Sequence, residues 1–185
     1  MKKIIFYILL CLGYQGFGQE TTPAKSTKDS TILIVEEKPV YLEKKGYKIQ
    51  IPKTWRLSEP CLDQNCSLFA PADTLLLPDT YVENINITVE KLSSTSYTVD
   101  QYTTFSIGYL PKVVQNFKLI SKKKVNGSTY VIEYKGRKNN YEQSWRQFYY
   151  VKNAKVFIVT FAAETPKFEY YKPLVEPTLK SFRLQ

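Results

Sequence analysis

The stretch that decides the fold is residues 117–163, which read FKLISKKKVNGSTYVIEYKGRKNNYEQSWRQFYYVKNAKVFIVTFAA. Three polar breaks divide it, at Asn126-Gly127, at Lys138-Asn139-Asn140 and at Asn153-Ala154. Asn-Gly strongly favours a two-residue hairpin turn, because both residues tolerate a positive φ. The segments between the breaks are rich in β-branched and aromatic residues. The stretch therefore predicts a four-strand antiparallel meander, with strands at Phe117–Val125, Ser128–Arg137, Tyr141–Lys152 and Lys155–Ala163.

The chain before this stretch predicts further strands and one helix. Apolar and polar residues alternate or cluster as in short strands at Tyr47–Ile51, Ser67–Ala70 and Ile85–Val89. Thr98 and Gln101 have the spacing of a capping box, in which each side chain satisfies a free amide at a helix start. The helix is expected to end near Tyr109. Its expected buried stripe is Val99, Tyr102, Phe105 and Tyr109.

The chain after the stretch predicts a closing helix. Thr165 is expected to cap it, with Pro166 at its first position. Pro173 and Pro177 lie within the helical pattern, so we expect a break or a kink. The apolar stripe is Phe168, Tyr171, Val175, Leu179 and Phe182. With a sheet that is apolar on both faces near Val156–Phe161, the pattern indicates an α+β fold with helices covering both faces of an antiparallel sheet.

The first residues have the pattern of an export signal. Residues 1–18 combine two lysines, a short apolar run and small residues before Gln19, so we expect a signal peptide with cleavage there. A lipid anchor at Cys11 is not favoured, because the large Leu10 precedes it. Residues 19–39 read as a flexible leader and 40–185 as a single domain. The sequence thus predicts a periplasmic or extracellular protein.

The cysteines fit an oxidising compartment. Once residues 1–18 are removed, only Cys61 and Cys66 remain. An even pair in an exported protein predicts a disulfide, here closing one short loop.

The charge balance favours anionic partners. The formal net charge is +9, and about +7 without the two lysines of the signal. A lipid headgroup or an acidic glycan would suit such a surface, while nucleic acid is not favoured. Because the basic residues are spread along the sequence, a solvated basic surface is the simpler interpretation.

Several catalytic chemistries are excluded by composition. The chain has no histidine, which removes histidine-dependent triads and histidine-ligated zinc. No glycine-rich phosphate loop is present, and we expect no metal and no cofactor. A paired-carboxylate hydrolase remains an alternative, with candidate acids Asp63, Asp73, Asp79 and Glu83. We expect a protein that binds rather than an enzyme.

A candidate binding face lies on the third predicted strand of the meander. Tyr141, Trp145 and Tyr149 share one side of it, and Arg137 and Arg146 lie close by in the sequence. Aromatic rings with neighbouring cations suit a glycan or another anionic polymer. The alternative is that these rings pack under a helix.

The order of these features resembles the PsbP-like domains. The resemblance rests on Tyr47-x-Ile49-x-Ile51-Pro52-x-x-Trp55, the capped middle helix, the hairpin at Asn126-Gly127 before Tyr134, and the final Ser181-Phe182. It spans about residues 40–184. The Cys61–Cys66 loop and the lack of histidine depart from the family.

The resemblance implies an α/β/α sandwich around an antiparallel sheet. It also implies a docking role, because photosystem II subunits of this family dock on a membrane complex and a nuclear-transport relative binds a small GTPase. Neither of those partners transfers to this chain. We therefore expect a non-catalytic docking domain that binds another protein or an envelope component.

Overall fold

The computed structural model describes residues 38–58, 61–62, 64–71 and 81–185. Residues 39–185 form one compact unit. The predicted signal peptide and the leader up to residue 37 lie outside the described residues. Among the residues that are described, no helix has the length and apolar character needed to cross a bilayer.

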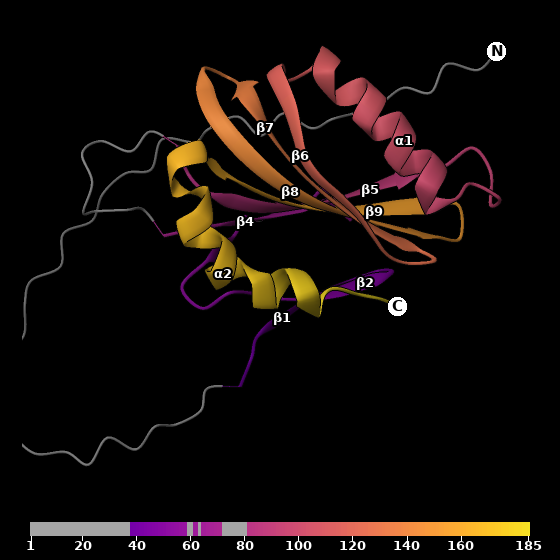
Figure 1. Ribbon diagram of the computed structural model, residues 1–185. Helices are drawn as coiled ribbons and strands as arrows, with labels where there is room; N and C mark the ends of the chain where they lie inside the picture. The colour runs from indigo at the N-terminus through magenta and orange to yellow at the C-terminus, as the bar shows by residue number, and fades with distance from the viewer. Residues whose placement is uncertain (1–37, 59–60, 63, 72–80) are drawn as a thin grey trace, which may run out of the picture. The chain divides into compact units, whose positions relative to one another are not determined.

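The fold is α+β, as predicted, and is built on two antiparallel sheets (Figure 1). The larger sheet has the strand order β3-β4-β5-β9-β8-β7-β6. Its strands are β3 (Arg56–Leu57), β4 (Cys66–Phe69), β5 (Asn84–Lys91), β6 (Gln115–Asn126), β7 (Thr129–Lys138), β8 (Tyr141–Lys152) and β9 (Lys155–Glu164). The smaller sheet has the order β1-β2-β10, with β1 (Tyr41–Lys44), β2 (Tyr47–Gln50) and β10 (Arg183–Leu184). The helices are α1 (Val99–Tyr109), the short 3₁₀ turn η1 (Leu110–Lys112) and α2 (Thr165–Ser181).

Two of the predicted breaks are tight turns, and the third is shifted by one residue. Asn139-Asn140 and Asn153-Ala154 have positive φ at both positions and join directly paired strands, which matches the twist of a two-residue hairpin. Asn126 instead ends β6 and pairs with Thr129. Neither Asn126 nor Gly127 has a positive φ. The Asn126 side chain accepts a hydrogen bond from the Ser128 amide at 3.0 Å, so the turn is closed by a side chain.

The middle helix begins as predicted and buries part of its predicted stripe, with Tyr109 partly buried. Thr98 and Gln101 form the reciprocal capping box. Val99 and Tyr102 are buried, but Phe105 is exposed, so its predicted place in the stripe is wrong. The helix packs with Thr103 instead, whose hydroxyl donates to the Val99 carbonyl at 2.7 Å. Because its hydroxyl is hydrogen-bonded within the helix, Thr103 can be buried at little cost in free energy.

The closing helix carries its predicted apolar stripe into the main core. Phe168, Tyr171, Val175, Leu179 and Phe182 are all buried. Phe182, just beyond the helix, stacks on Tyr47 of β2 at 5.5 Å between ring centroids. Thr165 is the first helical residue and Glu164 holds the cap position, so the predicted cap is displaced by one residue. Pro173 and Pro177 lie inside a continuous helix, and its axis changes direction along its length (Figure 1).

Neighbouring residues of β8 show how the helices meet the larger sheet. Tyr149 contacts α1, where its hydroxyl lies 2.8 Å from that of Ser106. Arg146, of opposite strand parity, contacts Glu176 of α2. We call the two sides of this sheet the α1 side and the α2 side.

Candidate functional site

The five residues of the predicted binding face do not share one surface. Tyr141, Trp145 and Tyr149 lie on the α1 side of β8, since alternate residues of a strand point the same way. Arg146 lies on the α2 side, as does Arg137, which pairs with Glu142 across the β7–β8 ladder. The aromatic and the cationic members are thus separated by the thickness of the sheet.

The aromatic residues are mostly covered. Trp145 is 5% exposed and stacks on Tyr134 at 4.9 Å, and Tyr149 is 1% exposed. Tyr149 packs edge-on against Tyr102 of α1 at 5.3 Å. Only Tyr141 is partly open, and its ring lies 5.2 Å from that of Tyr81. Ring faces held this way support the fold, and they are closed to a stacking ligand.

Burial beneath α1 also keeps this cluster in its neutral form. Desolvation raises the pKa of the Tyr149 and Tyr102 hydroxyls above their ordinary value. The pKa of Glu90 is raised by burial as well, although a hydrogen bond from the Tyr102 hydroxyl at 3.0 Å lowers it in part. Tyrosines with raised pKa values stay protonated near neutral pH, so they serve as hydrogen-bond donors and not as bases.

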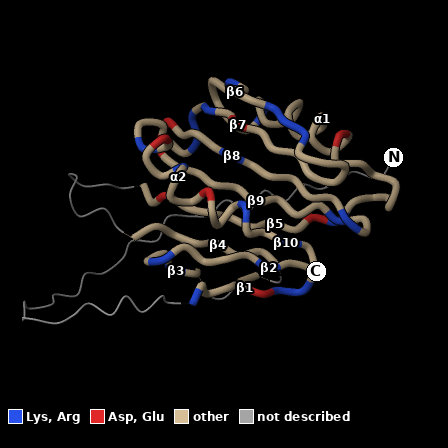
Figure 2. Tube along the Cα trace, turned by 60° about the horizontal axis from the view of Figure 1, so that its bottom comes forward, with Lys and Arg blue, Asp and Glu red and all other residues tan. Residues whose placement is uncertain are grey.

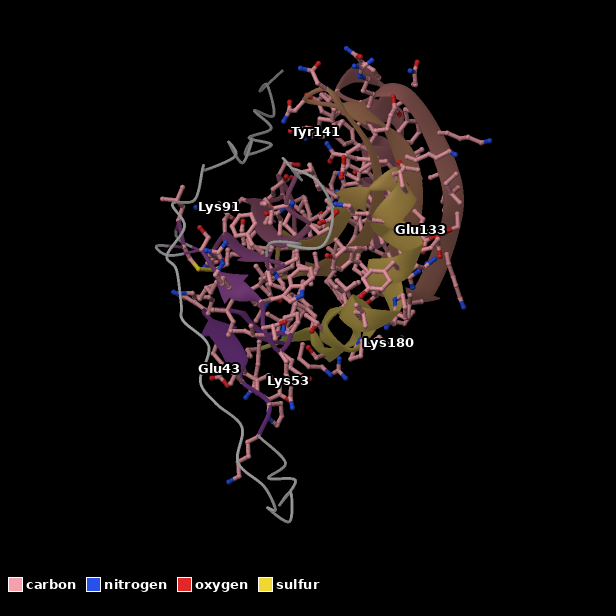
Figure 3. The ribbon with its side chains drawn as sticks, turned by 90° about the vertical axis from the view of Figure 1, so that its left-hand side faces the viewer. Glu43, Lys53, Lys91, Glu133, Tyr141 and Lys180 are labelled. Carbon is pink, nitrogen blue, oxygen red and sulfur yellow. A yellow bond between two sulfur atoms is a disulfide. The ribbon has the colours of Figure 1, made fainter. Side chains whose placement is uncertain are left out.

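Arg146 belongs to a network of ion pairs that joins α2 to the sheet. Its guanidinium bonds Glu133 of β7 and reaches Glu176 of α2 at 3.3 Å. Lys172 of α2 lies 3.1 Å from the same Glu133 carboxylate. Figure 3 shows Glu133 where α2 passes the strands of the larger sheet. Because Arg146 pairs with acids on both β7 and α2, its guanidinium stabilises the fold and is not available to a ligand.

Of the candidate carboxylates, only Glu83 lies within the described residues. Asp63, Asp73 and Asp79 lie outside them, and Glu83 is buried. Within residues 38–58, 61–62, 64–71 and 81–185, no three His, Cys, Asp or Glu side chains are grouped as a metal site requires.

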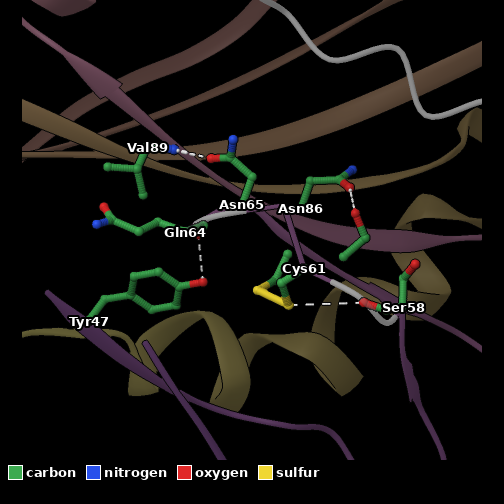
Figure 4. Close-up of a disulfide and its surroundings, with 9 residues drawn as sticks. Tyr47, Ser58, Cys61, Gln64, Asn65, Asn86 and Val89 are labelled. Carbon is green, nitrogen blue, oxygen red and sulfur yellow. Dashed lines mark hydrogen bonds between the residues drawn. A yellow bond between two sulfur atoms is a disulfide. The ribbon is translucent and has the colours of Figure 1, made fainter. Parts of the chain in front are cut away.

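The predicted disulfide between Cys61 and Cys66 is present. The loop it closes is held from two directions (Figure 4). Tyr47 of β2 donates its hydroxyl to the Gln64 carbonyl at 2.9 Å, and the Asn65 side chain accepts from the Val89 amide of β5 at 2.8 Å. The disulfide therefore fixes a loop that links the small sheet to the large one.

A cluster of exposed basic residues lies at the β6 end of the larger sheet. We define the basic edge as Lys118, Lys122, Lys123, Lys135 and Arg137, all exposed on β6 and β7. The register places four of them on the α2 side, while Lys122 is on the α1 side and lies over the Tyr130 ring. In the part of the chain that the structure describes, none of the five makes an ion pair. Figure 2 shows the run of basic positions along β6.

Two bulges interrupt β6 within or beside this cluster. The pairing with β7 shifts between Leu119 and Ser121 and again between Lys124 and Asn126. The residues left unpaired by these shifts are Ile120 and Val125, which are 52% and 53% exposed. A bulge redirects the side chain it carries. Both bulges thus leave a large aliphatic residue facing water among lysines.

The sequence alone indicates only part of the basic edge. The run Lys122-Lys123-Lys124 is visible in the sequence, but Lys124 pairs with Asp100 of α1. Lys135 joins the cluster only through the register that sets it opposite Lys118. The hairpin predicted at Asn126-Gly127 was the signal that could have aligned the two strands and placed Lys118 opposite Lys135.

Comparison with known proteins shows the fold. Neither models of protein families nor curated protein sequences give a match. Among solved structures, the solution structure of the cyanobacterial PsbP of Synechocystis, CyanoP, has a TM-score of 0.56 at 15% identity, covering 86% of this chain and 98% of its own. The crystal structure of LpqN, involved in cell envelope biogenesis of Mycobacterium tuberculosis, has a TM-score of 0.57 at 14% identity, covering 82% and 87%. PA94 of Pseudomonas aeruginosa, a protein of unknown function, has a TM-score of 0.56 at 16% identity, covering 77% and 94%.

These likenesses cover nearly the whole of each solved chain. At such low identity they show the fold alone. The chain therefore contains a domain with the PsbP-like fold, and the resemblance read from the sequence is confirmed at that level.

Proposed function

We propose that this protein is an exported, non-catalytic docking domain of PsbP-like type, which acts in the periplasm or outside the cell. It attaches to an anionic component of the cell envelope. The proposal takes the domain as an α/β/α sandwich whose meander, β6 to β9, ends in the basic edge. The described disulfide supports an oxidising address, and the role of LpqN in envelope biogenesis supports an envelope partner.

The observation that carries the proposal is a set of five exposed cations on two adjacent strands, none of which makes an ion pair with the described residues. Some other lysines of the domain have an acidic partner, as Lys124 has Asp100 and Lys172 has Glu133. On the basic edge no ion pair is formed with any described residue, although Glu142 lies opposite Arg137 in the β7–β8 ladder, and the five cations are close together on two adjacent strands. A single-sign patch attracts a partner of the opposite sign and directs its approach.

The absence of histidine supports a binding role over a catalytic one. The tyrosines beneath α1 are protonated near neutral pH, so they add no general base there.

Retention on the native envelope tests the proposal. The exported full-length protein would be mixed with envelope fractions of its own host, sedimented and washed at low and high salt. We expect retention that falls with salt, because screening weakens attraction between exposed charges. The edge variant, Lys118→Glu with Lys123→Glu and Lys135→Glu, should lose retention.

The matched control is Lys45→Glu with Lys91→Glu and Lys152→Glu, which makes the same change of charge at exposed sites away from β6 and β7. The control should retain most of its binding. Equal loss in both variants would show that net charge alone acts, and would contradict a defined docking surface. Turnover in a hydrolase screen that disappears on changing one acid to its amide would contradict the non-catalytic role.

A further inference from the structure

We infer that the basic edge docks on the surface of an anionic lipid bilayer, with Ile120 and Val125 entering the interface between headgroups and acyl chains. This inference rests on the proposed function and names the envelope component that the surface contacts. It is carried by the placement of two exposed aliphatic side chains among five exposed cations that make no ion pair with the described residues.

The composition of the edge fits lipid better than protein. Four of its five cations are lysines. Lysine is depleted in the cores of protein–protein interfaces, where tyrosine, tryptophan and arginine are enriched. A flexible ammonium group is a point charge that suits a diffuse layer of lipid phosphates. The basic edge is thus built for an anionic surface that lacks fixed pockets.

The bulges supply the second component of membrane binding. Cations alone hold a protein near an anionic bilayer, but stable association also needs apolar groups that enter it. Ile120 and Val125 lie at the two β6 bulges, where ladder pairing is interrupted. β6 is an edge strand and its residues from 120 to 126 are all exposed, so both aliphatic side chains are open to a partner.

Addition of a partner strand to β6 is less suited to this edge. Strand addition needs a long regular row of free backbone groups. The register of β6 against β7 shifts three times, and lysines line the strand. Bulges and edge lysines are the devices by which sheets prevent such pairing. The contacts must therefore come from side chains, as they do in docking on a bilayer.

Vesicle sedimentation tests the inference. The exported full-length protein would be mixed with phosphatidylcholine vesicles and with vesicles in which phosphatidylglycerol replaces part of the phosphatidylcholine. We expect binding to the second kind only. The edge variant should lower the partition coefficient by about 100-fold, because each cation near an anionic surface contributes about 1 kcal/mol, which is a factor of about five. The control variant at Lys45, Lys91 and Lys152 should lower it far less.

A second variant, Ile120→Ser with Val125→Ser, leaves every charge in place. It should lower partitioning by about tenfold through the lost apolar burial, and it should fold normally because both side chains are exposed. Unchanged partitioning would show that no side chain enters the bilayer, and would overturn the inference. Equal binding to both kinds of vesicle, or to neither, would also overturn it.

The proposed function can survive that failure. Retention on native envelope that depends on the basic edge, without binding to vesicles, would leave a docking domain whose partner is an envelope protein or an acidic glycan. Loss of both would remove the inference and the proposed function together.

Discussion

Lys118 of β6 lies directly opposite Lys135 of β7, so two like charges face each other across one rung of the antiparallel ladder. Such a pair destabilises a sheet. Features that destabilise the fold and have no structural role are characteristic of functional surfaces. The opposition is therefore the clearest sign that the basic edge is kept for docking.

Replacing Lys118 should separate stability from docking. Lys118→Glu turns a repulsive cross-strand pair into an attractive one, so we expect the free energy of unfolding to rise by about 0.5 kcal/mol. Lys123→Glu is the matched control, because Lys123 faces the apolar Val131 and should leave stability nearly unchanged. Urea unfolding of both variants measures this. Both should weaken envelope retention, and a Lys118 variant no more stable than the Lys123 variant would refute the cost described.

Gly136 of β7 is required by a close approach. A Cβ there would lie 2.5 Å from a methyl carbon of Val114 and 2.6 Å from the Gln115 carbonyl oxygen, where β6 begins. Gly136→Ala should cost about 2 kcal/mol through overpacking. Gly127→Ala, with no neighbour within 4 Å, should cost much less. Thermal unfolding distinguishes them, and equal losses would count against the packing described at the start of β6.

Glu90 should make stability depend on pH. Its folded-state pKa is raised by burial, so the folded protein holds this proton more tightly than the unfolded chain. The stabilisation is complete below the ordinary pKa of a glutamate, about 4.3, and is lost as pH rises through the higher folded value. Glu90→Gln is uncharged throughout and can still accept from Tyr102. It should be more stable than the wild type at pH 7 and should lose this advantage near pH 4. A variant less stable than the wild type at pH 7 would reverse the sign argued here.

The disulfide should add a modest amount of stability. For so short a loop the entropic contribution is about 2 kcal/mol, and a paired Cys61→Ser and Cys66→Ser variant should lose about that much. The loop contacts of Tyr47 and Asn65 should loosen, which amide exchange at Val89 would report. In the exported protein without residues 1–18, thiol labelling under denaturing, non-reducing conditions should find no free sulfhydryl. Two reactive thiols would exclude the bond in the exported form.

The local parts of this fold were readable from the sequence. The capping box at Thr98, the two asparagine turns after β7 and β8, and the α2 stripe each depend on residues close in sequence. The strands β1, β3 and β10 were not predicted, because segments of two to four residues carry too little periodicity. The apolar pattern of α1 predicts a buried Phe105, but the helix buries Thr103 instead. The hydrogen bond that allows this lies within the helix, and a pattern of apolar residues does not reveal it.

The candidate site was less predictable than the fold. Trp145 and Tyr149 share a strand with Arg146, and only the direction of each side chain separates the covered rings from the cation. The basic edge depends on cross-strand register and on bulges, which combine residues from two strands. Local sequence contains neither of these relationships.

Site-specific photo-crosslinking in the native envelope tests most directly that the basic edge is the docking surface. A photoreactive phenylalanine analogue would replace Ile120 at the edge, and in a separate variant Tyr170 of α2, which is 69% exposed. The account predicts that the Ile120 position forms crosslinks to an envelope component, lost in the Lys118, Lys123 and Lys135 edge variant, and that the Tyr170 position forms few. Crosslinks at the Tyr170 position with none at Ile120 would contradict it.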